Sequence, residues 1–206
     1  MALNNQNTAL VCSGGGAIGA YQVGVIKYIY EHFCDADGKP PFSLFSGVSA
    51  GALNATYLAS HSDQRHSNVG MLEKKWRQFH VPEYHQDVAR ALIKSVLKRI
   101  HFRTKNQPPW SIFDPKPMYD VVERSFRHEA LRRCFELGTT KGLAIAATET
   151  DTSMPVWFLD GPEAVSWNAF HSIGTKSEIN MKHIVASCSI PIFLPPVQIG
   201  HNYYVD

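Results

Sequence analysis

Short apolar runs alternate with amphipathic stretches along the chain, and this alternation is typical of an α/β protein. The first 60 residues contain the pattern twice. An apolar run at Ala9–Cys12 precedes a helix-like stretch that reaches Phe33, and a second run at 42–48 precedes another that reaches Ser60. Two strand–helix units in succession predict a parallel sheet covered by helices.

The later part of the chain predicts further elements. Apolar spacing predicts helices over 71–79, 88–100, 118–126 and 177–188, and apolar runs predict strands over 141–148 and 154–159. Ser177 is the expected N-cap of the last helix. Four prolines exclude regular structure over 107–117, and the final residues 197–206 predict a hairpin that turns at Gly200.

The turn after the second apolar run, Gly47-Val48-Ser49-Ala50-Gly51, fits the pattern G-x-S-x-G. In a nucleophile elbow the central serine sits in a strained conformation at a strand-to-helix turn. Side chains two residues before and after that serine collide, so glycine fits both places. The pattern is common by chance, but here it has the strand and helix that it needs. Ser49 is therefore a candidate nucleophile, with Gly47 and Gly51 as the elbow glycines.

The first strand runs into three consecutive glycines, Gly14, Gly15 and Gly16, which have several interpretations. With Gly19 they match a dinucleotide-binding loop, but that fold expects an acidic residue at the end of its second strand, where this chain has the Ser49 turn. A plain tight turn needs fewer glycines. We favour an oxyanion hole, in which backbone N–H groups of the loop donate to a developing alkoxide.

A nucleophilic serine needs a base, which is usually histidine. In the order of an α/β-hydrolase, Ser49 is followed by Asp160 and then by His183 or His201. That fold places several strands before its serine, whereas one strand–helix unit precedes Ser49 here. A histidine triad is therefore an alternative rather than the favoured interpretation.

Composition narrows the possible partners. The chain has 206 residues and a net charge of +2, which suits one domain and gives no argument for binding nucleic acid. Its four cysteines form no C-x-x-C pair, so we expect no metal site, and Cys12 and Cys188 lie in apolar runs typical of reduced, buried thiols. Neither a signal peptide nor an apolar run of about 18 residues is seen, so we expect a cytoplasmic or peripheral membrane location.

Several segments resemble the patatin-like phospholipase family, and they follow the order found in that family. They are Gly14–Gly19 with the helix after it, Gly47–Gly51, 111–117, 186–197 and Tyr203–Asp206. Because these segments span nearly the whole chain, the resemblance is specific.

The resemblance implies a three-layer α/β/α fold with a mainly parallel central sheet, formed by residues 1–206 as a single domain. It also implies a Ser–Asp dyad, with Ser49 as the nucleophile, Asp206 as the base, and neither a histidine nor a cofactor. The implied reaction is calcium-independent hydrolysis of acyl esters in phospholipids or neutral lipids. A free aspartate has a pKa of about 3.9 and is a weak base, so we expect burial to raise the pKa of Asp206.

Two features depart from the family pattern. Family members usually continue with Asp-Gly-Gly or Asp-Gly-Ala, whereas this sequence ends at Asp206, which indicates a domain truncated at its C-terminal end. Many members also carry arginine or lysine where Ile18 stands. An apolar residue there fits a backbone oxyanion hole but removes a positive charge.

A lipid substrate requires contact with a membrane surface. The basic amphipathic segment Val88–Lys105 suits an anionic lipid surface, although helices of this kind also pack on the cores of globular proteins. Trp110, Ile112 and Phe113 are candidates for a lipid-facing lip. Two further functions stay open, namely a Ser–His–Asp esterase acting on small soluble esters and a catalytically silent lipid-binding scaffold.

Overall fold

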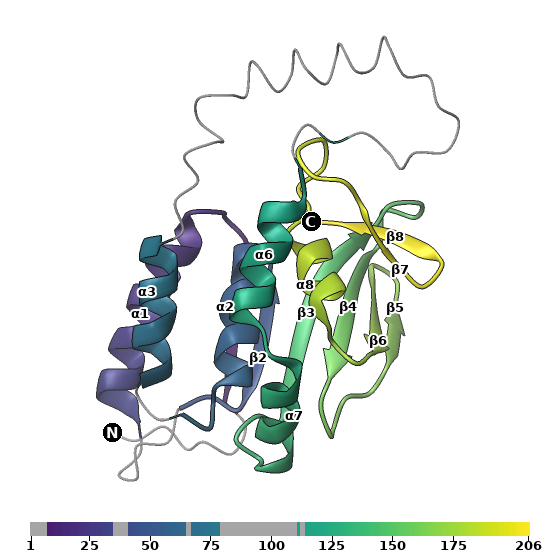
Figure 1. The fold of residues 1–206 in the computed structure, drawn as a ribbon. Coiled ribbons are helices and arrows are strands. Elements are labelled where there is room, and N and C mark those ends of the chain that lie inside the picture. Colours follow the sequence, from purple (N-terminus) through teal and green to yellow (C-terminus); the bar gives the residue numbers. More distant parts are fainter. Residues whose placement is uncertain (1–7, 35–40, 65–66, 79–110, 112–113) are drawn as a thin grey trace.

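The computed structural model describes residues 8–34, 41–64, 67–78, 111 and 114–206 (Figure 1). The helices are α1 (Ile18–Phe33), α2 (Ala50–Ser60), α3 (Ser67–Gln78), α6 (Lys116–Ser125), α7 (His128–Glu136) and α8 (Met181–Ser187). The strands are β1 (Ala9–Cys12), β2 (Leu44–Val48), β3 (Gly142–Glu149), β4 (Pro155–Asp160), β5 (Trp167–Ala169), β6 (Ser172–Lys176), β7 (Val197–Ile199) and β8 (Asn202–Val205).

The strands form one mixed sheet in the order β1-β2-β3-β4-β6-β5, with β8 paired to β3 and β7 paired to β8. β1, β2 and β3 are parallel to one another, as are β4 and β6. The other pairs are antiparallel, because short turns rather than helices join most of their strands. The α/β class is thus confirmed, and the sheet is mixed: the expected parallel pairing joins β1, β2 and β3 and also β4 and β6, and the other pairs are antiparallel.

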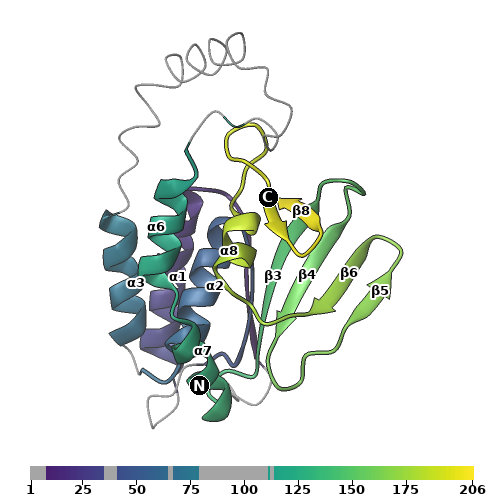
Figure 2. The ribbon, with the colours of Figure 1, turned by 45° about the vertical axis from the view of Figure 1, so that its right-hand side comes forward.

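The helices pack on one face of this sheet. α2 contacts β1, β2 and β3, while α8 contacts β3, β7 and β8 (Figure 2). The strands turn alternate side chains toward these helices, and the largest of those side chains are buried: Phe45, Leu143, Ile145 and Phe158. α1, α3, α6 and α7 each contact α2, so α2 is the centre of the helical layer.

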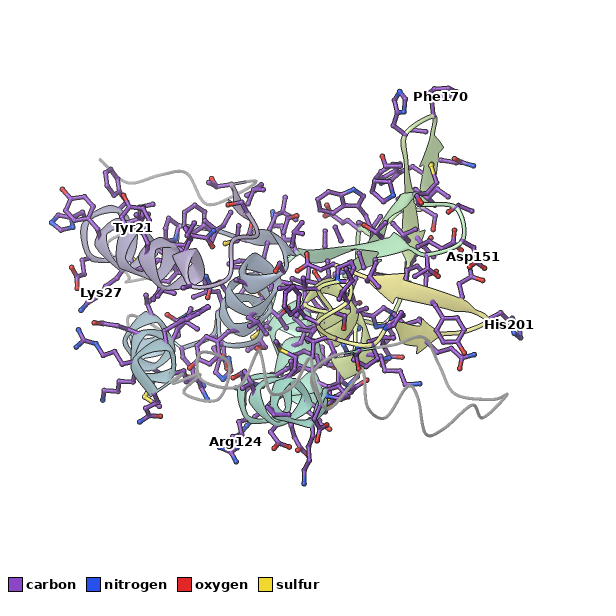
Figure 3. The ribbon with its side chains drawn as sticks, turned by 90° about the horizontal axis from the view of Figure 1, so that it is seen from above. Tyr21, Lys27, Arg124, Asp151, Phe170 and His201 are labelled. Atoms are coloured by element: carbon purple, nitrogen blue, oxygen red, sulfur yellow. The ribbon has the colours of Figure 1, made fainter. Side chains whose placement is uncertain are left out.

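The opposite face of the sheet is more open in the described residues. Val11 of β1 is 72% exposed. α1 also presents an exposed apolar stripe at helical spacing, consisting of Ile18, Tyr21, Val25 and Tyr28, with Tyr21 pointing outward in Figure 3. Of the three expected layers, the described residues contain the sheet and the helical layer on one face.

Most elements lie within a few residues of their predicted positions, and the C-terminal hairpin forms as predicted. The N-cap predicted for the last helix was wrong, because α8 begins at Met181 and Asn180 caps it instead of Ser177. The sequence pattern also did not predict α7, β5 or β6. Cys12 and Cys188 are buried and unpaired, as expected. The predicted helix over 88–100 lies outside the described residues.

Candidate active site

Ser49 stands at the turn between β2 and α2, with φ 54° and ψ −128°. Residues other than glycine rarely adopt a positive φ, and holding one there costs about 1–3 kcal/mol. The flanking glycines make the turn possible. A Cβ atom at Gly47 would overlap the backbone of Gly51, and a Cβ atom at Gly51 would overlap the carbonyl oxygen of Cys12. Larger residues at either position are therefore excluded unless the backbone moves.

The C-terminal end of α8 holds the Ser49 backbone from the other side. The Ser49 N–H donates to the Ser187 hydroxyl at 2.9 Å, and the Cys188 thiol donates to the Ser49 carbonyl oxygen at 3.3 Å. No sequence motif assigned a role to Ser187 or Cys188. Their one signal was their place in the 186–197 segment that resembles the family.

Asp206 follows β8, which lies beside the end of β3 through the pairing of Val205 with Thr148. Its N–H donates to the Ser189 carbonyl oxygen at 2.9 Å, so the same end of α8 also anchors Asp206. The Asp206 carboxylate lies within hydrogen-bonding reach of the Ser49 hydroxyl. Burial raises the pKa of Asp206, and the hydrogen bond with Ser49 acts in the opposite direction.

The glycine loop follows β1 and passes close to the serine. A Cβ atom at Gly14 would lie 3.2 Å from the Cβ of Ser49. Gly15 and Gly16 have φ values of 143° and 55°, which suit glycine best. Within the described part of the chain, the N–H groups of Gly14, Gly15 and Gly16 have no hydrogen-bond acceptor. These amides are therefore available as donors, and Gly14 lies directly beside Ser49.

A hydrogen-bond network holds the glycine loop against three helices. Gln22 of α1 donates to the carbonyl oxygen and the hydroxyl of Ser13 at 2.8 and 3.1 Å. The fully buried Asn54 of α2 donates to the Gly19 carbonyl and to the Gln22 side chain, and it accepts from the Trp76 indole of α3 at 2.7 Å. The loop is thus positioned by side chains that the motif itself does not contain.

Neither histidine of the alternative triad is joined to Ser49 by a described hydrogen bond. His183 accepts the Asn180 N–H at 3.1 Å as part of the α8 cap and packs edge-on against Phe158. Burial lowers the pKa of His183 to about 4. His201 is exposed at the tip of the C-terminal hairpin (Figure 3).

The acid of that triad, Asp160, is also committed elsewhere. It forms an ion pair with Arg132 and accepts the Ile179 N–H at 2.8 Å. Both contacts tie β4 to the helical layer and to the segment before α8. Asp160 therefore serves the packing of the sheet rather than the orientation of a histidine beside Ser49.

A family model described as patatin-like phospholipase matches residues 10–206. The chain belongs to this family. No curated protein matches the chain.

Two solved structures are similar to this chain at low sequence identity. A chain of the heterodimeric ExoU–SpcU complex of the type III secretion system of Pseudomonas aeruginosa is 18% identical, with a TM-score of 0.46, and the match covers 91% of this chain and 37% of that one. VipD from Legionella pneumophila is 15% identical, with a TM-score of 0.43, and the match covers 98% of this chain and 46% of that one. This patatin-like chain thus spans less than half the length of either protein.

The remaining expectations concern membrane-spanning helices, metal sites and the segments expected to contact lipid. No described helix has the length and apolar character needed to cross a membrane. Among the described residues, no three His, Cys, Asp or Glu side chains are grouped so that they could hold a metal ion. The segment Val88–Lys105 and the lip residues Trp110, Ile112 and Phe113 lie outside the described residues.

Proposed function

We propose that this patatin-like chain is a serine lipid acyl hydrolase in which Ser49 is the nucleophile and Asp206 is its base. The observation that carries the proposal is the placement of Ser49. It combines a positive φ at a strand-to-helix turn with a half-buried carboxylate within reach of its hydroxyl. A serine in this position has no evident structural reason to carry backbone strain, whereas a nucleophile elbow requires it.

In the proposed first step, Asp206 accepts the proton of the Ser49 hydroxyl while the serine oxygen attacks the ester carbonyl carbon. The negative charge moves to the carbonyl oxygen, where the N–H groups of Gly14, Gly15 and Gly16 stabilise it. The tetrahedral intermediate then expels the alcohol, which takes the proton from Asp206, and an acyl-serine is left. Water then attacks the carbonyl carbon of the acyl-serine while Asp206 accepts a proton from it. The second tetrahedral intermediate expels the Ser49 oxygen, which takes the proton from Asp206, and the carboxylic acid is released.

An aspartate suits this role only if its proton affinity is raised. Burial does this for Asp206 by disfavouring the charged form. The raised pKa brings the base nearer to the pH at which the enzyme works, as general base catalysis requires. The anchoring of the Asp206 backbone on Ser189 keeps the carboxylate in reach of the serine.

Family membership supports acyl esters of phospholipids or neutral lipids as the substrates. Such a substrate lies in a membrane or a lipid droplet, so the protein is expected to make peripheral contact with a lipid surface. The alternatives are a histidine-dependent esterase and a lipid-binding scaffold without turnover, and a single labelling experiment separates them from the proposal.

The test is labelling with a fluorescent fluorophosphonate, which reacts with activated serines. We expect the wild-type protein to be labelled, and we expect Ser49→Ala and Asp206→Asn each to lose labelling while keeping the wild-type circular dichroism spectrum. Labelling that survives Asp206→Asn would support a histidine triad. A folded wild-type protein that is not labelled would overturn the hydrolase proposal and support the scaffold. Release of fatty acid from phospholipid vesicles then identifies the ester that is cleaved.

A further inference from the structure

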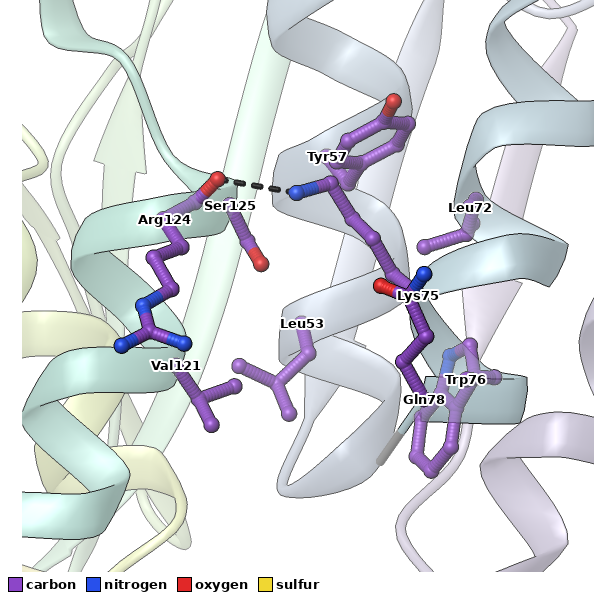
Figure 4. Close-up of a pocket in the computed structure, with 9 residues that line it drawn as sticks. All are labelled: Leu53, Tyr57, Leu72, Lys75, Trp76, Gln78, Val121, Arg124 and Ser125. Carbon is purple, nitrogen blue, oxygen red and sulfur yellow. Dashed lines mark hydrogen bonds between the residues drawn. The ribbon is translucent and has the colours of Figure 1, made fainter. Parts of the chain in front are cut away.

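A groove lies between helices α2, α3 and α6, on the side of α2 that faces away from the sheet (Figure 4). Its volume is about 150 Å³. Most of its walls are apolar, and the side chains concerned are Leu53, Tyr57, Leu72, Trp76 and Val121. None of these residues belongs to the proposed dyad or to the glycine loop. Walls of this kind favour a hydrocarbon chain over water.

Two cations line the same groove. Lys75 of α3 reaches across to α6, where its ammonium group donates to the carbonyl oxygen of Arg124 at 2.9 Å (Figure 4). The ammonium also lies 5.8 Å from the centre of the Tyr57 ring. The guanidinium of Arg124 belongs to the lining, and the charge of Arg127 acts on Lys75 as well. The groove thus combines apolar walls with a positively charged rim.

These cations have no anionic partner in the part of the chain that the structure describes. No carboxylate forms an ion pair there with Lys75, Arg124 or Arg127. Burial and the neighbouring charges of Arg127 and Arg124 lower the pKa of Lys75. The charges of Arg124 and Arg127 repel that of Lys75, and a bound anion would relieve that repulsion.

We propose that this groove binds a long-chain fatty carboxylate, with its chain between Leu53 and Val121 and its carboxylate on Lys75 and Arg124. The complementary charge favours this ligand over an uncharged lipid, which would leave the cations without a partner. The apolar walls favour it over a free inorganic anion, which would leave the groove unfilled. Binding here does not depend on turnover at Ser49, so this proposal stands apart from the proposed reaction.

The test measures binding of the fluorescent fatty acid cis-parinaric acid to the Ser49→Ala protein, so that catalysis plays no part. Decanoate and decanol, which share their chain length, are then compared as competitors. We expect decanoate to displace the probe at a concentration about tenfold lower than decanol, because a charge-assisted hydrogen bond adds to the affinity of the acid. Equal displacement by the two compounds would overturn the proposal, and this arm uses the unaltered groove.

The second arm changes the protein. The double variant Lys75→Met/Arg124→Gln is expected to bind the probe at least tenfold more weakly and to lose the preference for decanoate. The matched control, Lys176→Met/Lys182→Gln, removes the same net charge from positions outside the groove and should bind normally. Equal affinities of the two double variants would contradict the assignment. Displacement of the probe by inorganic phosphate as readily as by decanoate would show a general anion site and would also contradict it.

Discussion

The hydroxyl of Ser187 accepts a hydrogen bond from the backbone N–H of Ser49 at 2.9 Å, although the two residues are 138 positions apart. Both residues are buried. The bond joins the C-terminal end of α8 to the strained turn that follows β2. A strained φ persists only where surrounding contacts hold it, and Ser187 supplies one of those contacts.

We expect Ser187→Ala to slow the reaction of Ser49 with a fluorophosphonate about tenfold. We also expect it to lower the free energy of unfolding by about 1–3 kcal/mol, because the buried Ser49 N–H loses its acceptor. Labelling quenched at successive times measures the change in rate, and urea denaturation measures the change in the free energy of unfolding.

Ser60→Ala is the matched control for this experiment. Ser60 is buried at the far end of α2, where its hydroxyl donates to the Thr56 carbonyl oxygen at 2.8 Å. This variant should also lose stability, but its labelling rate should equal that of the wild-type protein. Equal slowing in both variants would mean that Ser187 acts through general stability and not through the position of Ser49.

The elbow glycine Gly51 is expected to tolerate no side chain. A Cβ atom there would overlap the carbonyl oxygen of Cys12 in β1, and backbone cannot move aside as a flexible side chain can. We expect Gly51→Ala to lower the free energy of unfolding by about 3 kcal/mol or more. The shift of the urea midpoint measures this loss.

Gly24→Ala provides the comparison, because Gly24 lies in α1 at a place where an added Cβ atom would have nothing within 4 Å of it. Alanine favours the helix more than glycine does, so the free energy of unfolding of this variant should rise by about 1 kcal/mol. A Gly51→Ala protein as stable as Gly24→Ala would show that the turn does not need glycine.

These positions differ in how far the sequence alone reveals them. Gly47 and Gly51 follow from the local geometry of a strand-to-helix turn, so a five-residue pattern is enough to predict them. The contacts of Ser187 and Ser189 with Ser49 and Asp206 arise from tertiary packing, and the contact with Ser49 spans most of the chain. No local pattern encodes such a contact, and the sequence therefore suggested Ser49 and Asp206 as a candidate dyad but not the contacts that hold them.

The secondary structure likewise follows from local sequence patterns only where it does not depend on contacts with distant residues. The apolar runs that became β2 and β3 are largely buried in the sheet, so their pattern predicts them well. β5 consists of Trp167–Ala169, all exposed, and it exists because it pairs with β6 rather than because of its own pattern. At the start of α8, Ser177 and Asn180 are both residue types that favour the N-cap position. Asn180 occupies it, because the His183 side chain accepts the Asn180 N–H and so completes a capping box.

The reaction of Ser49 should depend on the protonation of Asp206. Only the ionised carboxylate accepts the serine proton, so labelling should rise as the pH increases through the Asp206 pKa. Burial raises that pKa above the ordinary 3.8 for aspartate, so the midpoint of the rise should also lie above 3.8. The measurement is the initial labelling rate against pH, restricted to the range in which circular dichroism shows a folded protein. A midpoint at or below 3.8 would remove Asp206 as the controlling base.

His183 should make the fold less stable in acid. Burial lowers its pKa from 6.5 to about 4, so between these values the unfolded chain binds a proton that the folded protein excludes. The contribution of neutral His183 to the free energy of unfolding is complete above the unfolded pKa of 6.5 and is lost as the pH falls toward 4. Because one pKa unit corresponds to about 1.4 kcal/mol, the loss should amount to about 3 kcal/mol.

The variant His183→Gln isolates this contribution from those of the other titrating groups. Glutamine at this position keeps an acceptor for the Asn180 N–H, which preserves the capping box, but it does not titrate. Urea denaturation of both proteins across the same pH range should give a wild-type curve that falls more steeply in acid, by about 3 kcal/mol in total. Parallel curves would mean that His183 is protonated at no cost in the folded state, and its burial against Phe158 argues that this cost is real.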